Sequence, residues 1–391
     1  MICQGFQFAG VAAGIKKTGR KDLGLIFTSA SASAAGLFTR NRVQAAPVLL
    51  DRERIRRGSC RAVIVNSGNA NCCTGTHGRQ AALRMARCAA AGLNISEEQV
   101  LVASTGVIGE PLPAERIEAA APALIRALRS EGIPDFAEAI MTTDTVPKIV
   151  SRQGEASGKR FSVTGIAKGA GMIQPNMATM LCFVVSDILA SAEELRPMLL
   201  SAADRSLNRI TIDGDTSTND TTLLLANGLS GVTVERAADR DAVQSALNDV
   251  LLELARRLVK DGEGATKLVE VVVNGARSDQ EALRIADTVA NSSLVKTAFF
   301  GEDANWGRIL AAAGRAGVEL DPDKIDLRFD RVLMVKNGMG CGKTAEAEAT
   351  EVLRKPEFAI ALDLKLGSGR ASMLTCDFSM DYVKINADYR S

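Results

Sequence analysis

GIAKGAGMIQPNMATMLCFVVSD, residues 165–187, is the stretch whose pattern most limits the fold and the chemistry of the chain. Glycine, proline and asparagine accumulate in its first half, and an apolar run, Met180–Val185, follows abruptly. Such a change is typical of a tight turn that leads into a buried β-strand. Thr179 opens this strand and the small Ala178 precedes it, so the sequence predicts a hydroxyl at a strained junction.

A strained backbone at this junction would let the Thr179 hydroxyl attack the Ala178 carbonyl, and water would then cut the resulting ester. The product is an N-terminal threonine. The pKa of such an α-amine is ordinarily about 7.7, so it can accept the hydroxyl proton near neutral pH. The alternative from spacing alone is a buried turn threonine, because threonine is common at the start of strands. We therefore hypothesise cleavage between Ala178 and Thr179 and a nucleophilic Thr179.

Length and charge limit the class of protein. The 391 residues are 46% apolar and 24% charged, which predicts a large core and two or three structural units. The 47 basic and 46 acidic residues nearly cancel, so we expect small-molecule substrates and neither nucleic acid nor membrane as partner. The N-terminal residues lack the pattern of a signal peptide, and no apolar stretch reaches membrane-spanning length, which predicts a cytoplasmic protein.

Histidine and cysteine usage excludes several kinds of site. His77 is the only histidine and lies in NCCTGTHGRQ, residues 71–80, which we interpret as a loop. A Ser-His-Asp or Cys-His mechanism would need His77, and a site with several histidine ligands is excluded. The eight cysteines form no C-x-x-C pair, so we interpret them as reduced, small apolar residues. Asp213, Asp215 and Asp220 lack the glutamate of a calcium loop, so we predict no metal site there.

Short β-rich runs alternate with amphipathic helical patterns, which predicts a mixed α and β fold. A helix is expected over residues 241–260, where apolar residues recur on one stripe, and another over residues 115–129. Ser191 and Glu194 form a capping-box pattern, although Pro197 suits only the first turn of a helix. We interpret residues 151–159 as a surface loop or hairpin tip. The expected strands are residues 25–28, 62–65, 99–103, 161–164, 181–185, 221–226 and 268–273.

NGMGCGKT, residues 337–344, follows the strand-like residues 331–335 and suggests a phosphate-binding loop. A P-loop requires glycine where Asn337 stands, so a kinase or NTPase is disfavoured.

The motif KGAGMIQPNMATML, residues 168–181, resembles the signature of the ornithine acetyltransferase family, also called glutamate N-acetyltransferase. The resemblance covers essentially the whole chain. Further matching motifs are NSGNANCCTG (66–75), STGVIGEPL (104–112), MTTDT (141–145), TIDGDTSTNDT (211–221), DGEGATK (261–267) and GEDANWGRI (301–309).

The resemblance implies an α+β fold, a layered αββα sandwich of the ornithine acetyltransferase or DmpA-like type, built from two autoprocessed chains. Met1–Ala178 would be the α chain and Thr179–Ser391 the β chain, with a region from about residue 280 to 391 returning to the site. The implied reaction moves an acetyl group from N-acetylornithine to glutamate through an acetyl-threonine, in the acetyl cycle of arginine biosynthesis. It needs no cofactor, and acetyl-CoA as a second donor stays open.

The resemblance also implies roles for individual residues. Thr105 and Gly106 would stabilise the oxyanion, where spacing alone suggests a glycine turn. The implied substrate contacts are Thr142, with Thr143 left open, and Lys168, Thr179, Glu263, Asn386 and Ser391. Without the resemblance, Lys168 would be a surface lysine, Glu263 a loop carboxylate after a helix and the C-terminus a frayed tail.

Two other classes of function share these features. An aminopeptidase or amidase of the same self-cleaving architecture would let water intercept the acyl-enzyme, and a binding protein would have lost its chemistry. The intact motifs favour transfer. The resemblance further implies that the α and β chains associate, as a heterotetramer of two α and two β chains.

Overall fold

The computed structural model describes residues 3–17, 19–174 and 180–388 and divides into two compact units. The first unit comprises residues 1–208 and 215–258, and the second comprises residues 209–214 and 259–391. The predicted cut between positions 178 and 179 falls within the range of the first unit. The predicted α and β chains therefore do not coincide with the two units, and their existence stays a prediction.

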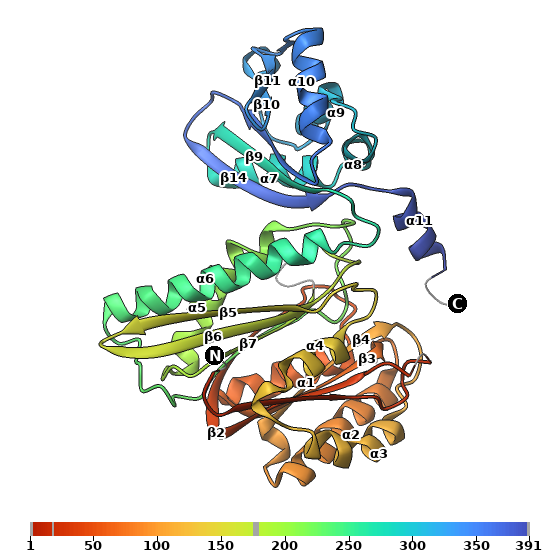
Figure 1. The fold of residues 1–391 in the computed structure, drawn as a ribbon, viewed down its shortest axis with the longest axis vertical. Helices are drawn as coiled ribbons and strands as arrows, with labels where there is room; N and C mark the ends of the chain where they lie inside the picture. Colours follow the sequence, from red (N-terminus) through yellow and green to blue (C-terminus); the bar gives the residue numbers. More distant parts are fainter. Residues whose placement is uncertain (1–2, 18, 175–179, 389–391) are drawn as a thin grey trace. The chain divides into compact units, whose positions relative to one another are not determined.

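The first unit is built on an eight-stranded mixed sheet in the order β4-β3-β2-β8-β7-β6-β5, with β1 paired to β2 (Figure 1). Among the described strands of this unit, only β3 with β4 and β7 with β8 pair in parallel. The strands are β1 (Phe6–Val11), β2 (Leu23–Phe38), β3 (Ser59–Asn69), β4 (Val100–Val107), β5 (Lys148–Ala156), β6 (Lys159–Lys168), β7 (Leu181–Ser186) and β8 (Thr221–Ala226).

Helices cover both faces of this sheet, and the side chains of β3 show why. Val63 and Val65 lie in one apolar cluster, whereas Ala62 and Ile64 lie in another on the opposite face. Alternate residues of a strand point to opposite faces, so a continuous apolar run requires cover on both. The helices are α1 (Ala46–Arg54), α2 (Gly75–Leu93), α3 (Ala114–Arg126), α4 (Ile133–Ile140), α5 (Ala192–Asp204) and α6 (Ala237–Lys260).

Each helix meets a different part of the sheet. Residues of α2 and α3 share a cluster with β3 and β4, whereas Phe136 of α4 contacts Phe183 of β7 edge-on, with ring centroids 5.6 Å apart. Figure 1 shows α5 and α6 on the side of β5 and β6. A Cβ on Gly165 would lie 2.6 Å from Leu254, so this glycine lets α6 approach β6 closely.

The second unit has its own six-stranded sheet, in the order β12-β11-β10-β13-β9-β14, and its own apolar core. Its strands are β9 (Leu268–Ala276), β10 (Asp326–Phe329), β11 (Val332–Lys336), β12 (Met339–Gly340), β13 (Glu357–Asp363) and β14 (Gly369–Cys376). Its helices are α7 (Asp279–Ala290), α8 (Ser293–Phe300), α9 (Trp306–Gly314), α10 (Lys343–Leu353) and α11 (Met380–Ala387). The predicted α+β architecture of sheets layered with helices is confirmed.

Most predicted elements are confirmed with ends that differ by four residues or fewer, and the capping box of Ser191 and Glu194 is confirmed. The strand predicted at residues 25–28 is longer, since β2 continues to Phe38. Gln99 is an exception, because it ends a short 3₁₀ helix before β4. Residues 151–159 contain the hairpin tip that was one of the two predicted alternatives, because Ser157 and Gly158 turn between β5 and β6. Residues 151–156 lie in β5 and do not form a surface loop. Pro197 lies in the second turn of α5, beyond the position predicted to tolerate it.

His77 was wrongly assigned to a loop: it lies, exposed, in the first turn of α2. The cysteines are free, and most are buried as predicted. Cys73 and Cys341 are exposed instead. Among residues 3–17, 19–174 and 180–388, no helix is long and apolar enough to span a membrane.

Candidate functional site

Three of the predicted site residues come together in the first unit around the ammonium group of Lys168. Its Nζ donates to Thr105 Oγ1 at 3.1 Å and to Thr142 Oγ1 at 2.8 Å. Thr105 comes from β4, Lys168 ends β6, and Thr142 lies between α4 and β5. Lys168 is only 8% exposed, so it is not a surface lysine. Its contact also favours Thr142 over Thr143 as the residue that faces the site.

Asp144 holds this cluster together, and it was not predicted. Its carboxylate accepts hydrogen bonds from Lys148 Nζ at 2.7 Å, from the Gly169 N–H at 2.6 Å and from the Thr142 N–H at 3.0 Å. Burial alone would raise the pKa of Asp144, but the charges of Lys168 and Lys148 and these hydrogen bonds together lower it to about 2. Asp144 is therefore ionised at neutral pH and fixes the backbone on both sides of the cluster.

Gly106 follows Thr105 at the end of β4, beside Gly68 of β3. Its φ is +132°, a conformation that favours glycine. A Cβ there would lie 2.3 Å from the carbonyl carbon of Gly68, so no side chain fits without moving the backbone. The geometry explains why glycine is required next to Thr105, and the oxyanion role of the pair stays a prediction.

Asp220 is a second buried carboxyl in the same unit. It is 2% exposed, directly precedes β8, and its Oδ2 has no hydrogen-bond partner among the described residues. Burial raises the pKa of Asp220 well above its usual value, against the opposing effects of Ser217 and Lys168. The Asp220 side chain therefore faces the interior of the first unit near Lys168.

The other two described site residues form a separate pair in the second unit. Asn386 Nδ2 on α11 donates to Glu263 Oε2 at 2.8 Å. Glu263 is 7% exposed, so it is not a solvated loop carboxylate. Ser379 caps α11, since its side chain accepts from the Tyr382 N–H, and the helix runs from Met380 to Ala387. This part of the chain does return to Glu263.

Asp377 holds the loop that carries Glu263. Its carboxylate accepts from the N–H groups of Thr266 and Lys267 at 2.8 and 2.9 Å, and from the Thr266 hydroxyl at 2.6 Å. Gly264 permits the close approach of α11, because a Cβ there would lie 2.5 Å from the Tyr382 nitrogen. The predicted nucleophile Thr179, its neighbour Ala178 and the terminal Ser391 lie outside the described residues, so their roles stay predictions.

Comparison with known proteins gives the family. The ArgJ family model matches residues 7–391. The chain belongs to the ArgJ family. It is 55% identical over 393 residues to the arginine biosynthesis bifunctional protein ArgJ of Geobacter sulfurreducens, covering all of both chains. It is 51% identical over 389 residues to the protein of that name from Syntrophotalea carbinolica, covering 99% of each.

A solved structure agrees with this assignment. The crystal structure of the arginine biosynthesis bifunctional protein ArgJ from Bacillus halodurans is 40% identical, with a TM-score of 0.51. The match covers 52% of this chain and 97% of that one. The predicted family is thereby confirmed.

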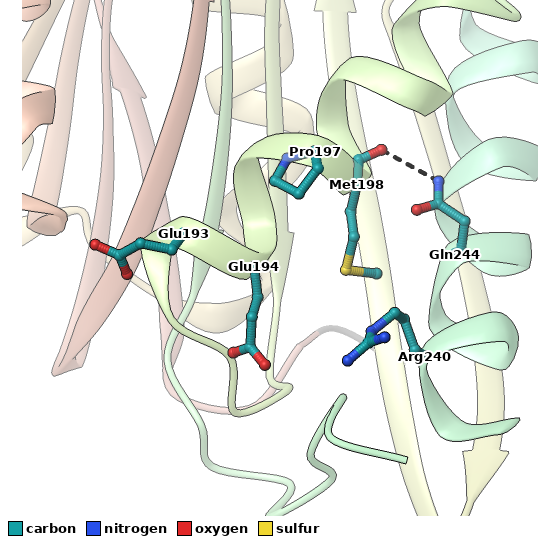
Figure 2. Close-up of a pocket in the computed structure, with 6 residues that line it drawn as sticks. All are labelled: Glu193, Glu194, Pro197, Met198, Arg240 and Gln244. Atoms are coloured by element: carbon teal, nitrogen blue, oxygen red, sulfur yellow. Dashed lines mark hydrogen bonds between the residues drawn. The ribbon is translucent and has the colours of Figure 1, made fainter. Parts of the chain in front are cut away.

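Two surface cavities of this ArgJ-family chain lie away from the predicted residues. One, of about 360 Å³, lies between α5 and α6, where Figure 2 shows Glu194 and Arg240 on facing helices. The other, of about 560 Å³, lies around the start of α2 and is lined by Arg42, Leu49 and Arg79 among others. Neither is lined by a predicted site residue, so the Lys168 cluster stays the best candidate for the chemistry of the first unit.

Proposed function

We propose that the chain is a glutamate N-acetyltransferase of arginine biosynthesis that cuts itself before Thr179 and acts on small-molecule substrates. The acetyl group would pass from the α-nitrogen of N-acetylornithine to the Thr179 hydroxyl and then to the α-nitrogen of glutamate. The names of the relatives, which refer to arginine biosynthesis, support this pathway. The observation that carries the chemistry is the convergence of Lys168 on the Thr105 and Thr142 hydroxyls.

This convergence suits Thr105 to stabilise an oxyanion. A hydroxyl has one proton to donate and two lone pairs that accept. Because Thr105 Oγ1 accepts from the Lys168 ammonium, its own proton can point to another acceptor, and the cation strengthens that donation. Donors fixed before the reaction stabilise the developing charge without reorganisation, and losing one such donor typically costs a factor of about 10²–10³ in rate.

The proposed cycle balances in two half-reactions. The Thr179 oxygen attacks the acetyl carbonyl of acetylornithine while its proton passes to the α-amine of Thr179. Collapse of the tetrahedral intermediate breaks the C–N bond, and ornithine leaves with that proton on its nitrogen. The α-amine of glutamate then attacks the acetyl ester, its proton returns to the Thr179 oxygen, and N-acetylglutamate leaves.

Self-cleavage is the step on which the rest depends. The same hydroxyl would first attack the Ala178 carbonyl, shift the acyl group from nitrogen to oxygen, and leave an ester that water hydrolyses. Residues 179–391 would form slightly more than half of the chain, and the solved ArgJ chain covers a similar share, 52%. This agreement supports a two-chain enzyme, and we expect two α and two β chains to assemble.

Intact mass and acetyl transfer test the proposal together. Wild type should give two chains of roughly equal size and transfer acetyl from acetylornithine to glutamate. Thr179→Ala should give one uncut, inactive chain, and Thr179→Ser, which keeps a hydroxyl, should still cut. An active wild type with an intact 178–179 bond would refute the mechanism. Hydrolysis of peptides without an acceptor would instead favour an aminopeptidase.

The same assay addresses the second donor. The relatives are called bifunctional, and we propose that acetyl-CoA also acetylates Thr179, so that no bound cofactor is needed. Acetylglutamate formed from acetyl-CoA and glutamate without acetylornithine would support this part. If no acetylglutamate forms from acetyl-CoA, acetylornithine is the only one of the two donors that the enzyme uses. Light scattering of the cut enzyme would give the mass of the assembly.

A further inference from the structure

Lys16 is a second lysine of the first unit that lies beside the predicted oxyanion residues, and no role has been given to it. Its backbone follows β1 in a loop held by Asp22. The Asp22 carboxylate accepts from the N–H groups of Ile15 at 2.6 Å and of Lys16 at 2.8 Å. Asp22 is fully buried at the start of β2. The position of Lys16 is therefore fixed by the sheet.

The Lys16 side chain lies over the end of β3. A Cβ on Gly68 would be 3.1 Å from Lys16 Cγ, so the absence of a side chain at Gly68 makes room for the lysine stem. Gly68 pairs with Gly106 of β4, and the preceding pair is Ser67 with Thr105. The stem of Lys16 thus crosses the strand end next to the one that presents Thr105 and Gly106.

The Lys16 ammonium is half-buried without a carboxylate bonded to it. Among the described residues its Nζ donates to one acceptor, the Lys21 carbonyl at 2.9 Å, although an ammonium has three protons. Both Asp22 oxygens are already engaged by backbone N–H groups. The pKa of Lys16 is lowered to about 8, because burial and the charge of Lys168 outweigh the opposing charges of Asp22 and Asp144.

We propose that Lys16 binds the side-chain carboxylate of the acceptor and so selects glutamate. This proposal rests on the proposed acetyl transfer. Donor and acceptor both carry an α-carboxylate, which we assign to Lys168, one of the predicted substrate contacts. Only glutamate brings a second carboxylate, whereas ornithine brings a side-chain ammonium. A second, incompletely bonded ammonium near Lys168 matches that additional negative charge.

Acceptor selectivity is the sharpest test. We compare kcat/KM for glutamate and for glutamine, whose side chain has the same shape without the charge, in wild type and in Lys16→Met. Wild type should prefer glutamate by at least about tenfold. Lys16→Met should raise the KM for glutamate by about tenfold and bring the ratio of kcat/KM for glutamate to kcat/KM for glutamine towards one. Lys16→Arg should restore most of the preference for glutamate. The release of ornithine from acetylornithine should fall far less.

Lys17→Met is the matched control, because Lys17 is the exposed next residue of the same loop, and it should leave the ratio at the wild-type value. A Lys16→Met enzyme that keeps its preference for glutamate would overturn the proposal. Equal loss of both half-reactions would also overturn it, since a group that binds only the acceptor spares ornithine release. If wild type transfers no acetyl group from acetylornithine, the proposed function itself fails before any variant is compared.

Discussion

Asp144→Asn keeps the size of the side chain and removes the one charge that faces both Lys148 and Lys168. Asp144 and Lys148 are 0% and 1% exposed as side chains and lie 2.7 Å apart, so the variant leaves a buried ammonium without its carboxylate. Breaking a buried ion pair from one side costs about 3–5 kcal/mol. We therefore expect Asp144→Asn to lower the free energy of unfolding by about that amount.

A second estimate comes from the pKa of Asp144, which falls from 3.8 to about 2 in the folded protein. At about 1.4 kcal/mol for each pKa unit, the folded state favours the ionised form by roughly 2 kcal/mol. Because the folded pKa lies below the unfolded one, this contribution is present above pH 4 and is lost as the pH falls towards 2. The acid branch of the stability profile should therefore be flatter in Asp144→Asn than in wild type.

Urea unfolding and transfer kinetics of Asp144→Asn, Lys148→Met and the double variant separate stability from positioning. The double variant removes both charges, so most of the lost stability should return. Acetyl transfer should stay at least about tenfold low in it, because the amide introduced by Asp144→Asn has one accepting oxygen where the carboxylate has two, so the N–H of either Gly169 or Thr142 loses the acceptor that positions it. If the free energy of unfolding of Asp144→Asn lies within about 1 kcal/mol of the wild-type value, the buried ion pair does not stabilise the fold as argued. Full activity in the double variant would refute the positioning argument.

Two further substitutions probe the other predicted parts of the site. Gly106→Ala should abolish transfer and destabilise the protein by about 2 kcal/mol or more, since its Cβ would meet Gly68 at 2.3 Å. Gly109→Ala, also at positive φ but with open space around it, should cost less in thermal unfolding and spare activity. Asp377→Asn should lower transfer about tenfold by loosening the Glu263 loop, whereas the exposed-site control Asp381→Asn should not; equal activities would contradict this role.

The strands were predictable where burial on both faces imposes a continuous apolar run. Ala62–Val65 and Leu181–Val185 are such runs, and both lie inside the sheet. Residues 151–156 were not predicted as a strand because β5 is an edge strand of this sheet and pairs with β6 alone among the described strands. The unpaired side of an edge strand faces solvent, so its residues can be polar and lack the apolar pattern that indicates a buried strand. Gly75 and Gly78 similarly obscured the start of α2 around His77.

The candidate site likewise contains residues that the sequence indicated and residues that it did not. Motifs indicated Thr105, Thr142 and Lys168, and the fold brings their side chains into contact. Asp144 lies in the matching motif MTTDT and Lys16 lies outside the matching motifs, but the sequence assigned neither a role because their importance depends on strands far apart in sequence. Asp144 matters through Gly169, which lies 25 residues away. Such partners become visible only once the register of the sheet is known.

The charges of the side chains around Lys168 bear on which substrate this part of the first unit would bind. Asp144 stays ionised and holds Lys148, whereas burial shifts Asp220 towards its neutral form. The carboxyl groups near Lys168 therefore differ in charge because one has cationic and N–H partners and the other is mainly desolvated. The raised pKa of Asp220 reduces the negative charge that would oppose an incoming carboxylate. Two lysines beside the predicted oxyanion residues suit an acceptor that carries two carboxylates better than one that carries two ammonium groups, as the proposed preference for glutamate requires.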